Sequence, residues 1–159
     1  MGAFSGQSGK RFLSATHELV VDREDLILVQ QASELKETWI AVSGKAVLGD
    51  MTMSLKSGGD VSLTSEKNVA MLDRNKLTFP LCWRPWREGD YFYPLGMKHR
   101  KNVSDFLIDA KVPLPDKRTV SVLESNGEIV WLVGFRIDDR YKLTEGTTES
   151  LVATIEFPQ

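Results

Sequence analysis

The stretch MTMSLK, residues 51–56, has an apolar side chain at every odd position and a polar side chain at every even position. This period of two predicts a half-buried β-strand, because successive side chains of a strand point to opposite faces of the sheet. SGGD at 57–60 predicts a turn, and VSLT at 61–64 resumes the alternation. We therefore predict a hairpin across residues 51–64.

Further strands are predicted on both sides of this hairpin. HELVV and LILV, residues 17–21 and 26–29, are apolar runs separated by the polar turn at 22–25. Towards the C-terminus, Asn126-Gly127 predicts a tight turn between strands at 120–123 and 129–133. Short strands are also predicted at 69–72 and at 151–157, where apolar residues again alternate with more polar ones.

One segment, residues 101–112, predicts a clear helix. Val103, Phe106, Leu107 and Ala110 follow the spacing i, i+3, i+4, i+7, which places them on one apolar stripe. Asn102 is suited to cap its start, and Pro113 ends it. The predicted fold class is α+β, predominantly antiparallel β and sandwich-like, with this one clear helix.

The composition suits an ordinary globular chain of 159 residues, 42% of them hydrophobic. One cysteine excludes an intramolecular disulfide, and one cysteine with two histidines cannot form a usual closed zinc site. No apolar run is long enough for a membrane helix, and the N-terminus has no signal-peptide pattern. We therefore expect a cytoplasmic chain with no membrane partner and no metal.

No catalytic constellation is found in the sequence. SGGDVS, residues 57–62, is close to a pyrophosphate-binding SGGxDS loop, but its acidic residue comes one position early and no helix follows. We interpret it as a turn between strands. Cys82 lies between Leu81 and Trp83 in a predicted strand, which favours a buried structural thiol over a nucleophile. The sequence therefore predicts no catalytic residues in this chain.

The net charge of −2 hides a local concentration of positive charge. Residues 82–118 hold eight basic and five acidic side chains, whereas the flanking segments 1–81 and 119–159 carry −1 and −4. The same window is rich in aromatic residues, and cations pair with phosphates while flat rings stack on bases. The predicted RNA contacts are Arg84, Arg87, Lys98, Arg100, Lys101, Lys111, Lys117 and Arg118, with Trp86 and Tyr91 as stacking residues. The alternative is a solvated basic face over an aromatic core.

Residues 84–113 also carry a family pattern. Arg84-Pro85, a basic residue, Gly89-Asp90, an aromatic residue and Pro94-Leu95-Gly96 precede a Lys-rich turn, a Phe-centred helix and a proline. This order resembles the C-terminal domain of bacterial tRNA(Ile)-lysidine synthetase, in the Bacteroidetes-like branch, and the similarity extends to about residue 140. His99 and Asn102 depart from the pattern, where a glycine and a second lysine are common.

The resemblance implies that this chain is a fragment of a larger, ATP-dependent ligase. The parent's N-terminal domain, absent here, would use ATP and lysine to convert the wobble cytidine of isoleucine tRNA to lysidine. No cofactor is expected in this fragment, whose implied partners are isoleucine tRNA, towards the acceptor arm, and that catalytic domain. The expected domains are a β-rich linking subdomain at 1–78 and an α+β tRNA-binding domain at 79–159. A β-rich dimerisation module, pairing through strand edges within 46–72, remains the alternative function.

Overall fold

The computed structural model describes residues 11–13, 17–22, 25–30, 37–58 and 66–157. They belong to two compact units, residues 1–36 and residues 37–159. In the first unit, β1 (Arg11–Leu13), β2 (His17–Asp22) and β3 (Asp25–Gln30) form an antiparallel sheet in that order. The pairing of β2 with β3 confirms the predicted hairpin at 17–29, although two residues of its turn lie outside the described part.

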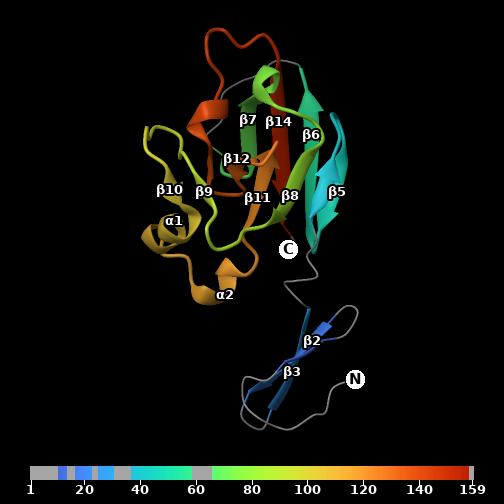
Figure 1. The fold of residues 1–159 in the computed structure, drawn as a ribbon. Helices are drawn as coiled ribbons and strands as arrows, with labels where there is room; N and C mark the ends of the chain where they lie inside the picture. The colour runs from blue at the N-terminus through green and yellow to red at the C-terminus, as the bar shows by residue number, and fades with distance from the viewer. Residues whose placement is uncertain (1–10, 14–16, 23–24, 31–36, 59–65, 158–159) are drawn as a thin grey trace. The chain divides into compact units, whose positions relative to one another are not determined.

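The second unit is built on two antiparallel sheets. The five-stranded sheet has the order β13-β12-β11-β8-β4, with bounds Arg136–Ile137, Glu128–Leu132, Ser121–Ser125, Leu81–Pro85 and Thr38–Ile40. The four-stranded sheet has the order β5-β6-β14-β7, with bounds Lys45–Leu48, Met51–Ser57, Ser150–Glu156 and Val69–Asp73. Figure 1 shows the strands of both sheets, and apolar side chains from both sheets are buried. The predicted class, largely antiparallel β with few helices, is confirmed.

Strand β6 confirms the alternation predicted for residues 51–56. Met51, Met53 and Leu55 are buried, and the residues between them are partly exposed. Its pairing differs from the prediction, because β5 lies along one edge of β6 and β14 along the other. The second strand of the predicted hairpin, residues 61–64, lies outside the described residues. The reason for the difference is that sheet partners depend on long-range packing, which a local pattern does not reveal.

Strand β14 lies at the centre of the four-stranded sheet, between β6 and β7. In the other sheet, β4 pairs with β8. Strands from before residue 78 are therefore paired with strands from after it, and 37–159 is one compact unit. The division between the compact units falls at 36/37, and the domain division expected at 78/79 stays a prediction.

The helix α1 (Val103–Asp109) covers one face of the five-stranded sheet (Figure 1). Val103 and Leu107 are fully buried in a cluster with Phe92, Val122 and Leu132. The helix is shorter than predicted, since Ala110 is its exposed C-terminal cap and Lys111 has a left-handed φ of 57°. Asn102 is at the N-cap position, but its side chain forms no capping hydrogen bond.

Candidate nucleic-acid interface

A short hairpin projects the predicted cations from the second unit. Strands β9 (Tyr91–Phe92) and β10 (Lys101–Asn102) pair antiparallel, with Lys101 opposite Phe92. Residues 93–100 between them, here called the cationic loop, carry Lys98, His99 and Arg100 in exposed positions. No salt bridge joins Lys98 or Arg100 to another described residue. The loop therefore presents positive charge to solvent.

Two adjacent carboxylates hold this loop in place. The Tyr93 N–H donates to Asp138 Oδ2 at 2.9 Å, and the Gly96 N–H donates to Asp139 Oδ1 at 3.1 Å. The Asp139 N–H donates back to the Tyr93 carbonyl at 2.6 Å. Asp138 is fully buried, and its carboxylate also accepts from the Arg140 guanidinium. The loop is thus fixed at several backbone positions.

The same contacts favour the ionised form of Asp139. The hydrogen bond from the Gly96 backbone and then the Lys142 ammonium lower the pKa of Asp139 below its ordinary value of 3.8. Gly96 has a φ of +87°, a conformation in which a side chain would be strained. The Pro-Leu-Gly sequence therefore forms a turn whose amide donates to a charged acceptor.

Tyr91 is the stacking candidate that the structure leaves accessible. It is 44% exposed, and the Arg100 guanidinium lies 4.7 Å from the centre of its ring. Trp86 differs, because its Nε1–H donates to the Lys117 carbonyl at 2.7 Å and its ring packs against the α1 cluster. Trp86 is therefore placed as a packing residue and not as a stacking platform.

Arg84 does not lie with the exposed cations. It is 6% exposed, and its guanidinium donates to both Asp90 oxygens, at 2.9 and 3.0 Å, and to Glu124 Oε2 at 3.0 Å. Hydrogen bonds to these two carboxylates raise the pKa of Arg84 against the opposing effect of burial. A phosphate would have to displace both carboxylates, so the placement does not support Arg84 as an RNA contact.

The other predicted contacts fall into separate groups. Arg87 is exposed and forms no salt bridge with a described residue, whereas Lys101 is paired with Asp109 of α1. Lys111 and Arg118 are exposed, and Lys117 is half-buried at the end of α2 (Leu114–Lys117). In Figure 1, α1 lies between the β9–β10 hairpin and α2. Lys117 belongs to α2, Lys111 precedes it and Arg118 follows it, so these last three cations are grouped around α2.

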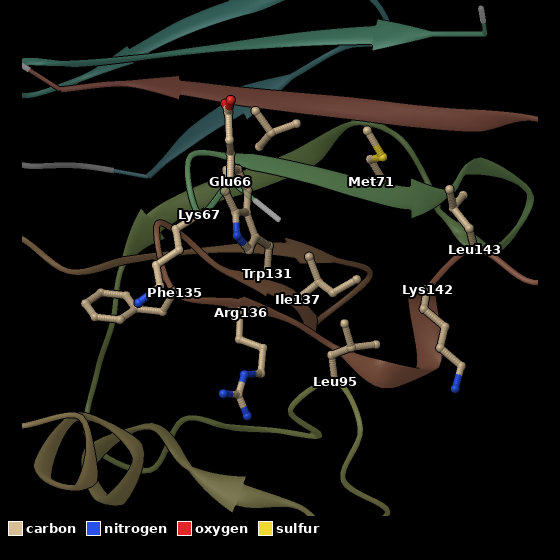
Figure 2. Close-up of a pocket in the computed structure, with 11 residues that line it drawn as sticks. Glu66, Lys67, Met71, Leu95, Trp131, Phe135, Arg136, Ile137, Lys142 and Leu143 are labelled. Atoms are coloured by element: carbon tan, nitrogen blue, oxygen red, sulfur yellow. The ribbon is translucent and has the colours of Figure 1, made fainter. Parts of the chain in front are cut away.

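Three cations outside the window 82–118 also lie near the loop, around a pocket of about 400 Å³ (Figure 2). They are Lys67, Arg136 and Lys142. The Arg136 guanidinium also lies 5.4 Å from the centre of the Phe106 ring. The charge count by segment does not reveal them, because residues 1–81 and 119–159 both carry a net negative charge. Lys67, Arg136 and Lys142 come close to one another because β13 and β7 are neighbouring strands.

Of the groups considered for catalysis, the structure describes Cys82 and the first two residues of SGGDVS. Cys82 is buried, and burial, followed by the nearby Glu124 and Glu37 carboxylates, raises the pKa of its thiol to about 12. Within the described ranges, no cluster of three or more His, Cys, Asp or Glu is suited to hold a metal ion. Gly58, in the sequence SGGDVS, has a φ of +82° and donates to the Ser150 carbonyl, while residues 59–62 are not described.

Among the described residues, no helix is long and apolar enough to cross a membrane.

Two family models match the chain. Residues 81–153, which contain the cationic loop and both of its carboxylate anchors, match the TilS substrate C-terminal domain, and residues 1–31 match the TilS substrate binding domain. This chain belongs to the TilS family. The TilS C-terminal match begins at β8, close to the residue where the expected second domain begins.

Curated relatives carry the same family name. The tRNA(Ile)-lysidine synthase of Parabacteroides distasonis is 36% identical over 154 residues, which are 94% of this chain and 35% of that protein. The enzyme of Bacteroides thetaiotaomicron is 31% identical over 150 residues, again 94% of this chain and 34% of that protein. This TilS chain therefore spans about a third of the length of these relatives. Both findings agree with the resemblance stated above.

A solved structure shows the same fold. The crystal structure of a TilS C-terminal domain superposes with a TM-score of 0.67 at 19% sequence identity, covering 78% of this chain and 99% of that one. At this identity the likeness concerns the fold alone.

Proposed function

We propose that this chain is the tRNA-binding C-terminal region of a tRNA(Ile)-lysidine synthase. The observation that carries the proposal is the cationic loop, whose exposed Lys98 and Arg100 form no salt bridge with a described residue and whose backbone is held by Asp138 and Asp139. Exposed cations on a fixed backbone suit phosphate contacts, which position a nucleic acid without reading its sequence.

The residues assigned to RNA are fewer than the charge pattern predicts. Lys98, Arg100 and Arg87 are proposed as the main phosphate contacts, and Tyr91 as a stacking residue beside Arg100. Lys101 contributes less because it is paired with Asp109. Lys111, Lys117 and Arg118 are proposed as a second, weaker group beyond α1. Arg84 and Trp86 are left out.

The proposed partner is isoleucine tRNA, held by its acceptor arm. The relatives from Parabacteroides distasonis and Bacteroides thetaiotaomicron are tRNA(Ile)-lysidine synthases. By the resemblance, a catalytic domain outside this chain would adenylate the wobble cytidine with ATP and add lysine. The chain's own task would be to hold the substrate in the cytoplasm while that domain acts.

The experiment is a titration of the chain with isoleucine tRNA between about 50 and 200 mM salt. The double variant Lys98→Glu/Arg100→Glu should weaken binding strongly and reduce the salt dependence, because phosphate contacts release counterions. The matched control is Lys45→Glu/Lys56→Glu, which makes the same charge change on exposed residues of β5 and β6. Equal losses in both double variants would contradict a specific site at the loop.

A second function is favoured by exposed apolar residues on the edge strands β4 and β5. Trp39 on β4 is 59% exposed and Val47 on β5 is 61% exposed, and both strands are sheet edges. Edge strands with apolar side chains pair readily with another chain, which suits a homodimer. Light scattering over a concentration series tests it, with Trp39→Lys expected to abolish any dimer. A monomer at every concentration would rule this function out.

A further inference from the structure

A pocket opens where the edges of the two sheets meet. Strand β7 is the edge of the four-stranded sheet, β13 is the edge of the five-stranded sheet, and the two strands are neighbours. Side chains from both strands, from the cationic loop and from residues 142–143 surround a volume of about 400 Å³ (Figure 2). This β7–β13 pocket is of the size that accepts a small organic ligand.

The floor and walls of the pocket are apolar. Met71 of β7, Ile137 of β13 and the buried Trp131 all line the pocket (Figure 2). Phe135 and Leu143 extend the same surface. Such a lining favours a flat, weakly polar ring over a sugar or a hydrated ion, because the walls offer few hydrogen-bonding groups.

The rim of the pocket is positively charged. Lys67 and Arg136 form no salt bridge with a described residue, and Lys142 is paired with Asp139. Glu66 is the acidic side chain of the lining. An occupant with a flat ring and an attached anion would therefore satisfy both the walls and the rim, and a nucleotide has both parts.

The pocket is continuous with the cationic loop. Leu95 belongs to that loop and also lines the pocket, and its N–H donates to the Ile137 carbonyl at 3.0 Å. Arg136 reaches from the pocket to the Phe106 ring of α1. RNA bound at the loop would therefore pass the mouth of the pocket, and proteins commonly read RNA by accepting unstacked bases.

We infer that the β7–β13 pocket takes a single unpaired nucleotide of the tRNA bound at the cationic loop, its base against Met71 and Ile137 and its phosphate beside Lys67 and Arg136. This inference rests on the proposed function. It adds a base-binding site to a surface that otherwise contacts phosphates.

The test compares two RNA hairpins with the same stem, one blunt and one with a short single-stranded 3′ extension containing 2-aminopurine. The full chain should bind the extended hairpin about tenfold more tightly, which is the value expected for one stacked base. The 2-aminopurine emission should change on binding, because its neighbours change when the base enters the pocket.

Met71→Glu places a carboxylate in the pocket and should remove the gain from the extension while leaving the affinity for the blunt hairpin unchanged. Thr154→Glu is the matched control, since Thr154 lies in the same sheet, on β14 beside β7, but does not line the pocket. Lys67→Ala, at an exposed position, is the second variant and should reduce the gain without disturbing the fold.

The possible outcomes separate the two proposals. Equal wild-type affinity for both hairpins, or equal behaviour of Met71→Glu and Thr154→Glu, would overturn the pocket inference and leave phosphate binding intact. Failure to bind either hairpin would overturn the proposed function together with the pocket.

Discussion

Arg84 joins three parts of the second unit through one guanidinium. It lies on β8, and its partners are Asp90 in the connection to β9 and Glu124 on the adjacent β11. The Arg84 side chain is 7% exposed, and the Asp90 and Glu124 side chains are 13% and 15% exposed. Removing the cation would leave two nearly buried carboxylates close together without compensation, which is far more costly than losing an exposed ion pair.

We expect Arg84→Met to lower the free energy of unfolding by about 3 kcal/mol, since methionine retains much of the side-chain volume but not the charge. Urea unfolding followed by circular dichroism measures the loss. The control is Arg87→Met, an exposed residue three positions along, which should change stability by no more than about 0.5 kcal/mol. Similar values for the two variants would contradict the structural role of Arg84.

Asp139 connects loop geometry with pH. Because its pKa is lower in the folded chain than the ordinary 3.8, ionised Asp139 stabilises the fold at pH values above that number. As the pH falls from the ordinary pKa through the lower folded-state pKa, the carboxylate becomes protonated first in the unfolded and then in the folded chain, and the stabilisation is lost.

We therefore expect Asp139→Asn to lower the melting temperature at about pH 6, and the difference from wild type to shrink by about pH 3. Thermal melts across this range provide the measurement. Glu145→Gln, an exposed carboxylate on the neighbouring loop, is the control and should show little difference at either pH. A constant difference for Asp139→Asn at both pH values would mean that its charge does not stabilise the fold.

For single residues, the sequence shows where charged and aromatic side chains are concentrated, but it does not show which partners they contact. The window 82–118 is basic and aromatic, as counted, but counting cannot show that Glu124, 40 positions away, neutralises Arg84. Nor does it show that Asp138 and Asp139 hold the loop, because acidic residues subtract from a charge sum whatever they bind. The pairings arise from strand register, which a local pattern does not contain.

The elements themselves were largely predictable. The alternation at 51–56, the Asn126-Gly127 turn and the stripe of α1 are local features, and the structure confirms the first two in full and the stripe as far as Leu107. Asn126 and Gly127 have φ values of 49° and 85°, as a tight hairpin turn requires. The partners of β6 were not predictable, because the alternation along β5, β6, β7 and β14 is compatible with several strand orders.

Helix α1 should depend on its buried stripe. Leu107→Ala should lower the free energy of unfolding by about 2 to 5 kcal/mol, because it leaves a cavity against the sheet. Ile108→Ala, the next residue on the same helix, is 59% exposed and should have little effect. Chemical denaturation of the two variants measures the contrast, and equal losses would argue against the docking of α1 through Leu107.

At the scale of the whole molecule, the pairing of early with late strands determines which fragments fold. A chain of residues 37–159 retains both sheets and should unfold cooperatively by circular dichroism. A chain of residues 79–159 lacks β5, β6 and β7, so β14 would lose the strands on both of its edges. We expect this shorter chain not to fold. A cooperative melt would show instead that residues 79–159 form an independent domain, with a boundary near residue 78.

The central position of β14 also affects the order in which the chain is assembled during synthesis. All strands of the five-stranded sheet have been synthesised once residue 137 is added. Asp73 of β7 cannot pair with its partner on β14 until Ser150 has been synthesised. At the usual rate of translation this delay lasts roughly 4 to 15 s. During that time the edges of β6 and β7 that later pair with β14 have no partner. The surface proposed to hold tRNA therefore forms on the first sheet before the second sheet closes behind it.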